Sequence, residues 1–288
     1  MGVASVRTGF FMILCLLTCA VVSGCIGSGT DGETDAIDVI VSIPPFSEWV
    51  EAVGGEHVDI TVLVPEGASP HTYELTPSTV VKAENAEIWV RNGVGLEFWA
   101  EKVMNVNTGL TVIDVSEGID LIDVNGGYDP HIWLSLEVAR EGVSKITDVL
   151  CELDPEHSET YHANMEAYVE RLNEVDESIR STLDKTDKKM FIAYHSTWSY
   201  FARDYGLTQI SVEQEGKEPT PQHIAHVIEI ARENGIHVIF VEPQFSTDDA
   251  NTIAREIGGS VLSINPLASS YAANMEDIAE TLREGMGG

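Results

Sequence analysis

Short apolar runs alternate with amphipathic segments along most of the chain. Between residues 37 and 153 the apolar runs predict strands and the amphipathic segments predict helices, and the same alternation returns between residues 187 and 288. Such alternation is typical of mostly parallel sheets with helices on both faces. The sequence therefore predicts an α/β fold with two lobes, 37–153 and 187–288.

The expected strands are rich in valine and isoleucine, and turn residues bound them. In the first lobe they span 37–43, 58–64, 87–90 and 110–115, and in the second 190–194, 207–212, 236–241 and 261–264. The expected helices span 44–53, 76–82, 96–104 and 135–152, then 197–205, 221–234, 247–257 and 275–284. Each lobe is thus expected to hold a similar set of strand–helix units.

A longer helical run, 154–186, separates the two lobes. Pro155 stands in its first turn, where proline is tolerated. Apolar residues recur along it at steps of three or four, namely Tyr161, Met165, Tyr168, Leu172, Val175 and Ile179. A helix of about 30 residues is roughly 45 Å long. We expect this helix to connect the lobes as a rigid backbone.

The charge of the chain is strongly negative. It holds 47 Asp and Glu against 16 Lys and Arg, a net charge of −31. Such a surface repels nucleic-acid phosphates and draws cations. Because the acids are spread along the whole chain, they favour solubility in salty surroundings over a local role. We expect a monomer with no nucleic-acid partner.

Residues 1–25 have the layout of an export signal. Arg7 precedes the apolar stretch 9–22, which is short for a membrane span, and 22–25 (Val-Ser-Gly-Cys) resembles a lipobox. Residues 26–36 are polar and glycine-rich, as in a flexible tether. We expect Cys25 to carry a lipid that anchors the protein to the outer face of the cell membrane. An uncleaved anchor helix is the alternative.

The cysteines exclude a disulfide framework in the exported part. Of four in the chain, only Cys151 lies beyond the export signal. It ends an amphipathic segment, and we expect it to be a small buried apolar residue.

Three histidines occupy similar places relative to the expected strands. His71 lies in a loop after the second strand, His131 follows an Asp-Pro pair, and His195 directly follows the strand 190–194. Ligands of open α/β sheets bind at the carboxyl ends of strands, and three imidazoles suit Zn²⁺. The sequence predicts a metal site in a cleft between the lobes.

The other histidines give weaker signals. His57 borders a strand and is expected to be structural. His157 and His162 are five residues apart on the long helix and do not share a face. His223 and His226 have helical spacing, which favours a solvated face.

Four motifs stand out by their order and spacing along the chain. They are Ser69-Pro70-His71-Thr72-Tyr73-Glu74, Asp129-Pro130-His131-Ile132-Trp133, the segment 195–207 that begins with His195, and the segment 238–245. From about residue 37 to the C-terminus, these motifs resemble those of the solute-binding lipoproteins of ABC transporters for zinc and manganese. The resemblance implies two α/β lobes joined by one rigid helix, a metal ion in the cleft, and delivery of the ion to a membrane permease.

The resemblance also implies the ligands. Family members place metal ligands at the positions of His71, His131 and His195. A histidine at the third position goes with zinc-type members and a glutamate with manganese-type members, and ligand softness gives the same preference. Zn²⁺ is therefore expected, with Mn²⁺ as the alternative.

The sequence leaves several alternatives for the fourth ligand of this site. The family often has an aspartate where this chain has Asn265, and a neutral amide oxygen is a poor zinc ligand. Water, Glu242 or Glu213 could complete a tetrahedron instead. The histidine-rich loop of zinc importers is also missing, because 117–128 contains no histidine.

Two other functions use a similar site. Three histidines and a water also occur in hydrolytic zinc enzymes. The chain has no His-Glu-x-x-His helix and no Gly-x-Ser-x-Gly turn, so we expect no enzyme. Asp129 and Glu74 are expected to be hydrogen-bond partners or helix caps. A surface adhesin with a structural metal is the remaining alternative.

Overall fold

The computed structural model describes residues 1–3, 36–124, 126–213 and 219–287. Residues 35–288 form one compact unit, which is distinct from residues 1–34. Apart from residues 1–3, the predicted export signal with Cys25 and nearly all of the predicted tether lie outside the described residues. Within the described ranges, no helix is long and apolar enough to cross a membrane.

The first half of the chain supplies a sheet and the helices that cover it. These are β1 (Ile37–Val41), α1 (Pro45–Gly54), β2 (Val58–Val62), α2 (Pro77–Asn85), β3 (Ile88–Arg91), α3 (Ala100–Val106), β4 (Thr111–Asp114) and α4 (Leu136–Leu153). The sheet is parallel, in the order β2-β1-β3-β4. Val39 and Val41 pack in one core with α1 and α4, while Ile40 packs in another with α2 and α3. Burial on both faces explains why the strand is apolar apart from the exposed Asp38 near its start.

The second half repeats this plan. Its elements are β7 (Met190–Ala193), α6 (Ser199–Tyr205), β8 (Thr208–Ser211), α7 (Pro221–Glu233), β9 (Val238–Val241), α8 (Asp248–Glu256), β10 (Ser260–Ser263) and α9 (Tyr271–Met286). The sheet is parallel, in the order β10-β9-β7-β8. In each sheet the strand that comes first along the chain lies between the second and the third. The predicted α/β fold with two mostly parallel sheets is thus confirmed.

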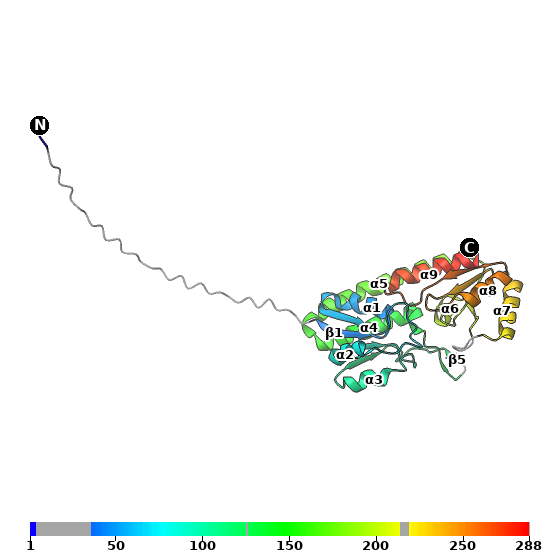
Figure 1. Ribbon diagram of the computed structural model, residues 1–288, viewed down its shortest axis with the longest axis horizontal. Helices are drawn as coiled ribbons and strands as arrows, with labels where there is room; N and C mark the ends of the chain where they lie inside the picture. The colour runs from blue at the N-terminus through cyan, green and yellow to red at the C-terminus, as the bar shows by residue number, and fades with distance from the viewer. Residues whose placement is uncertain (4–35, 125, 214–218, 288) are drawn as a thin grey trace. The chain divides into compact units, whose positions relative to one another are not determined.

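One long helix, α5 (Ser158–Leu183), joins the two halves. Its 26 residues make it about 39 Å long. The 3₁₀ turn η3 (Pro155–His157) precedes it, so the regular helix begins later than the sequence predicted. Helix α9 packs beside α5 (Figure 1). The largest apolar core contains residues of α5, of α9 and of both sheets. This shared core makes α5 a rigid link between the two halves.

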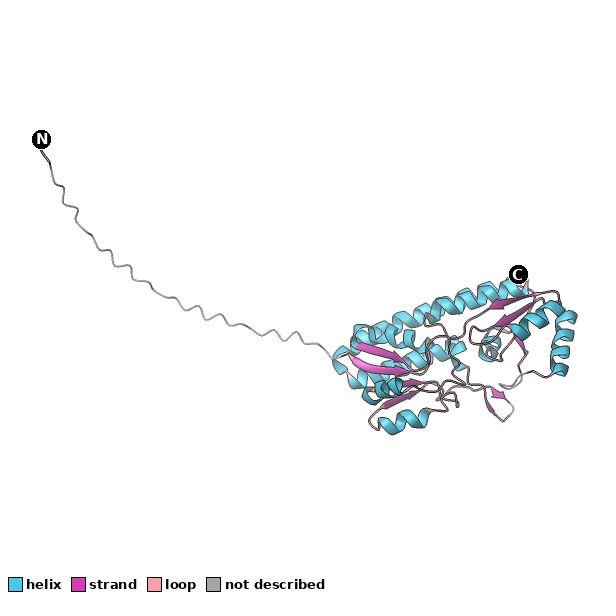
Figure 2. Ribbon diagram, viewed as in Figure 1, coloured by secondary structure: helices cyan, strands magenta, loops and turns pink. Residues whose placement is uncertain are grey.

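Some boundaries differ from the sequence prediction. Helix α3 begins at Ala100, later than predicted. The residues before it form a turn, in which the carboxylate of Glu97 accepts the backbone N–H groups of Asn92 and Gly93. A small hairpin of β5 (Asp123–Val124) and β6 (Gly127–Tyr128) was not predicted (Figure 2).

Two further details concern single side chains. The Thr76 hydroxyl accepts the N–H of Thr79 at 3.2 Å and so caps the start of α2. Cys151 is only partly buried, although full burial was expected. The lobe boundaries 37–153, 154–186 and 187–288 stay a prediction.

Candidate metal centre

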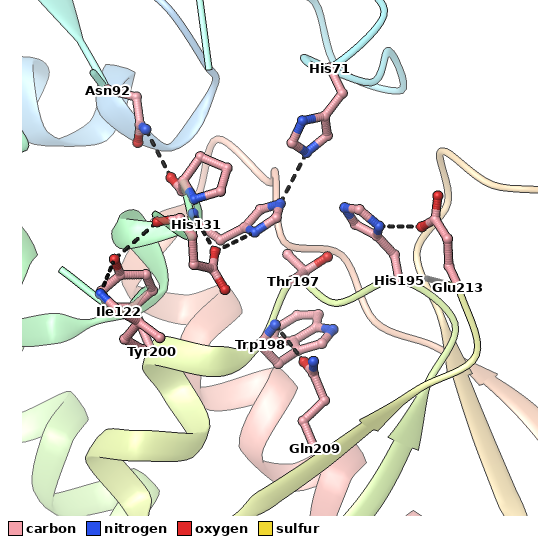
Figure 3. A network of polar contacts seen from close by, with 12 residues as sticks. His71, Asn92, Ile122, His131, His195, Thr197, Trp198, Tyr200, Gln209 and Glu213 are labelled. Atoms are coloured by element: carbon pink, nitrogen blue, oxygen red, sulfur yellow. Dashed lines mark hydrogen bonds and ion pairs between the residues drawn. The ribbon is translucent and has the colours of Figure 1, made fainter. Parts of the chain in front are cut away.

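The three predicted histidines come together at the carboxyl ends of strands. His71 follows β2, His131 follows β4 and the β5–β6 hairpin, and His195 follows β7. One ring nitrogen of each lies within 4.8 Å of the other two. The ring centroids are 5.1 to 5.3 Å apart and the rings meet edge to face. Figure 3 shows the rings facing one another across loops from both halves.

A carboxylate fixes the ring of His131. Asp129 Oδ1 lies 2.7 Å from His131 Nδ1 and also accepts the backbone N–H of His131 at 2.9 Å. With Nδ1 occupied, Nε2 faces the site, where it lies 3.0 Å from Nε2 of His71 (Figure 3). An acceptor behind a histidine is the usual way to fix the tautomer and orientation of a metal ligand.

Side chains from both halves hold the loop that carries His131. Asn92 donates from Nδ2 to the Pro130 carbonyl at 2.8 Å. The Tyr200 hydroxyl donates to the Asp129 carbonyl at 3.0 Å and accepts the N–H of Ile122 at 3.1 Å (Figure 3). Sequence reasoning missed Asn92 and Tyr200, because a single polar residue near a loop has no spacing that marks it.

The ring of His195 is fixed in a similar way. Its Nδ1 forms a short hydrogen bond to Glu213, which follows the neighbouring strand β8 (Figure 3). Phe245 packs against the ring, with centroids 4.9 Å apart. His195 Nε2 is buried and has no hydrogen-bond partner among the described residues. A buried nitrogen without a partner is costly, and a metal ion would satisfy it.

The three candidates for a fourth ligand have different surroundings. Glu213 lies behind His195, on the Nδ1 side of the ring. Asn265 Oδ1 accepts the backbone N–H of Leu267 at 3.0 Å. Glu242 lines the cavity, and its Oε1 accepts hydrogen bonds from Thr197 and Trp198. Its Oε2 has no partner among the described residues, and burial raises the pKa of this carboxyl.

The cavity is small and largely apolar. It opens to solvent, has a volume of about 260 Å³ when the adjoining solvent is included, and is lined by the three histidines together with Trp133, Phe245, Pro266 and Leu267, among others. These side chains leave little free space between them, which favours an ion with few waters over an organic ligand.

The electrostatics keep two of the imidazoles neutral. Burial lowers the pKa of His131. Burial of the ring, with the nearby imidazoles of His131 and His195, lowers the pKa of His71 to about 3, although His71 as a residue is exposed. Hydrogen bonds from His131 hold the pKa of Asp129 below its usual value against the effect of burial. Neutral imidazole beside an ionised carboxylate is the state that binds a metal ion.

Two parallel sheets on one rigid helix, with convergent imidazoles between their strand ends, define a solute receptor for a metal ion. Residues 39–285 match the family model described as zinc-uptake complex component A, periplasmic, or ZnuA. The chain belongs to this family of metal-binding, solute-binding transport proteins. Since the family is not enzymatic, the zinc hydrolase alternative is excluded.

Named relatives differ in their metal. The high-affinity zinc uptake system protein ZnuA of Bacillus subtilis is 31% identical over 284 residues, covering 90% of this chain and 88% of the relative. The manganese-binding lipoprotein MntA of Halalkalibacterium halodurans is 29% identical, covering 86% and 85%. A crystal structure of ZnuA superposes with a TM-score of 0.86 at 37% identity, covering 88% of this chain and 100% of that one.

Proposed function

We propose that the chain is an extracytoplasmic receptor that captures Zn²⁺ between His71, His131 and His195 and passes it to the permease of an ABC transporter. The observation that carries the proposal is the set of ligand atoms. Among the described residues, the three imidazoles cluster within 4.8 Å with no carboxylate in the group. Nitrogen-rich sites suit zinc, whereas Mn²⁺ favours oxygen ligands.

The distances support a tetrahedral ion. Two nitrogens that bind zinc at about 2.0–2.1 Å lie roughly 3.3 Å apart. The Nε2 atoms of His71 and His131 are already 3.0 Å apart. The rings of His71 and His131 therefore need little movement to bind an ion. The carboxylates behind His131 and His195 hold those two rings in their orientation.

Water is the fourth ligand in this proposal. Glu242 lines the cavity with one oxygen that has no partner among the described residues. Burial raises the pKa of Glu242, so its carboxyl is suited to donate a hydrogen bond to a bound water. Asn265 is not needed for this role, because its oxygen caps the turn to Leu267.

Release would need only local shifts. The Trp133 ring donates from Nε1 to the Pro266 carbonyl at 2.8 Å, and the Tyr271 hydroxyl donates to the Trp133 carbonyl at 2.8 Å. These bonds and the continuous core around α5 tie the halves together. Movement of the loops that carry His71 and His195 is therefore favoured over wide hinge opening.

The proposed location follows from the N-terminal sequence. The family is periplasmic, and the manganese-binding relative is named as a lipoprotein. We propose that Cys25 carries the lipid and holds the receptor at the outer face of the cell membrane beside its permease.

Metal titration tests the function. The full-length chain is titrated by competition with Zn²⁺, Mn²⁺ and Mg²⁺, with His226→Ala as a control, since that side chain is 63% exposed on α7. We expect tight binding of Zn²⁺ in wild type and control and much weaker binding of the other ions. Equal, weak binding of all three would overturn the proposal, and tighter Mn²⁺ would support the manganese alternative.

A further inference from the structure

A second group of metal-ligating side chains lies away from the three-histidine site. It consists of His57, Asp154 and His157, which we call the turn cluster, and one ligand atom of each lies within 4.8 Å of the others. His57 directly precedes β2, and the other two lie in the turn between α4 and α5. The turn cluster is therefore at the amino ends of the strands, whereas His71 follows the carboxyl end of β2.

The turn cluster has a defined geometry. Asp154 Oδ2 lies 2.6 Å from His157 Nδ1 and accepts the Tyr161 hydroxyl at 2.7 Å. The ring of His57 stacks on that of His157, with centroids 3.9 Å apart and an interplanar angle of 23°. All three members are partly buried, so an ion would reach them from solvent yet be shielded in part.

One buried nitrogen of the turn cluster, Nδ1 of His57, has no hydrogen-bond partner among the described residues. Leaving such a group unpaired costs about 1–3 kcal/mol. The bonds among Asp154, His157 and Tyr161 account for those three side chains as a structural network, but they leave this nitrogen unexplained.

The donors define the class of ligand. Two imidazole nitrogens and one carboxylate oxygen are a common set for Zn²⁺ and for other first-row divalent cations that accept nitrogen. A net charge of −31 on the chain raises the local concentration of any cation. An organic anion would be repelled by the carboxylate of Asp154 and by the negative net charge of the chain.

We propose that His57, Asp154 and His157 form a second binding site for a divalent first-row cation such as Zn²⁺, with water in the remaining positions. The two stacked rings turn so that one nitrogen of each points at the ion. Since this movement breaks the stacking and the ion displaces His157 from its bond to Asp154, the second site binds more weakly than the three-histidine site.

The test counts zinc ions on the full-length chain by calorimetric titration and by metal analysis. Wild type is expected to bind two equivalents, one tight and one weak. The variant with His57→Ala and His157→Ala is expected to lose the weak equivalent only. Conversely, His71→Ala is expected to weaken the tight equivalent and keep the weak one, which separates this proposal from the proposed function.

Matched controls make the assignment specific. His226→Ala removes an exposed histidine elsewhere, and Cys151→Ser removes a thiol beside the turn, near His162. Both are expected to keep two equivalents. If the double variant does not fold, as judged by circular dichroism, Asp154→Asn takes its place. The proposal would be overturned if wild type bound one equivalent, if the double variant or Asp154→Asn kept the weak equivalent, or if a control lost it.

Discussion

The three-histidine site and the turn cluster use the same kinds of side chain in different ways. In the three-histidine site, Asp129 and Glu213 bond to Nδ1 of His131 and His195, behind the rings. In the turn cluster, the carboxylate lies among the ligands themselves and is shared by His157 and Tyr161. The rings meet edge to face at 65° to 84° in the first and stack at 23° in the second.

This difference shows what makes a cluster of ligands a prepared site. A carboxylate behind an imidazole leaves the other nitrogen free and aimed, so that little energy is spent on rearrangement when the ion arrives. A carboxylate bonded to its own neighbour must first give up that bond. The three-histidine site is thus expected to bind far more tightly, although both contain two or more imidazoles.

The largest expected effect is the loss of a ligand from the three-histidine site. His195→Ala is expected to weaken zinc binding by more than about 100-fold, since even partners behind a ligand contribute about 10–100-fold. Competition with a chelating dye measures it. His57→Ala serves as the comparison and is expected to leave tight binding unchanged. Similar tight binding in both variants would show that the wrong cluster was assigned.

A smaller effect is expected from the carboxylates behind the rings. Asp129→Asn and Glu213→Gln are each expected to weaken zinc binding by about 10–100-fold while the protein stays folded. Asp154→Asn in the turn cluster is the matched change and is expected to leave the tight site unaffected. The same competition assay measures all three, and an unchanged affinity in Asp129→Asn and Glu213→Gln would contradict the orienting role.

The smallest effect concerns pH in the metal-free protein. The pKa of His71 is about 3 in the folded state, whereas an unfolded histidine titrates at about 6.5. Below about pH 6.5 the unfolded state therefore binds a proton that the folded state does not, and stability is lost as the pH falls toward about 3. We expect the melting temperature of wild type, relative to His71→Ala, to fall over this range. A constant difference would contradict the lowered pKa.

Much of the fold could be predicted because its signals are local. The strand 37–41 is apolar and buried at every position but Asp38, and the stripe along α5 from Tyr161 to Leu183 has helical spacing. The order of strands and the shared core around α5 depend on contacts between distant residues, which no local pattern contains.

The candidate site likewise has features that local sequence patterns predict and features that depend on contacts between distant residues. His71 and His195 could be located after strands from the sequence alone, and His131 was marked by the Asp-Pro pair before it. The parallel sheets bring the first two to the same edge of the fold. The pairing of Glu213 with His195 depends on β7 and β8 being neighbours in the sheet. The turn cluster was missed because His57 and His157 are far apart in sequence and meet only through packing.

A crystal structure of the protein grown with equal Zn²⁺ and Mn²⁺ tests the central claim most directly, with anomalous diffraction at the absorption edge of each metal. We predict a zinc signal between His71, His131 and His195, with three nitrogens at about 2.0–2.1 Å and a water as the fourth ligand. A manganese signal at this position, or an ion held by Asn265 away from the histidines, would contradict it.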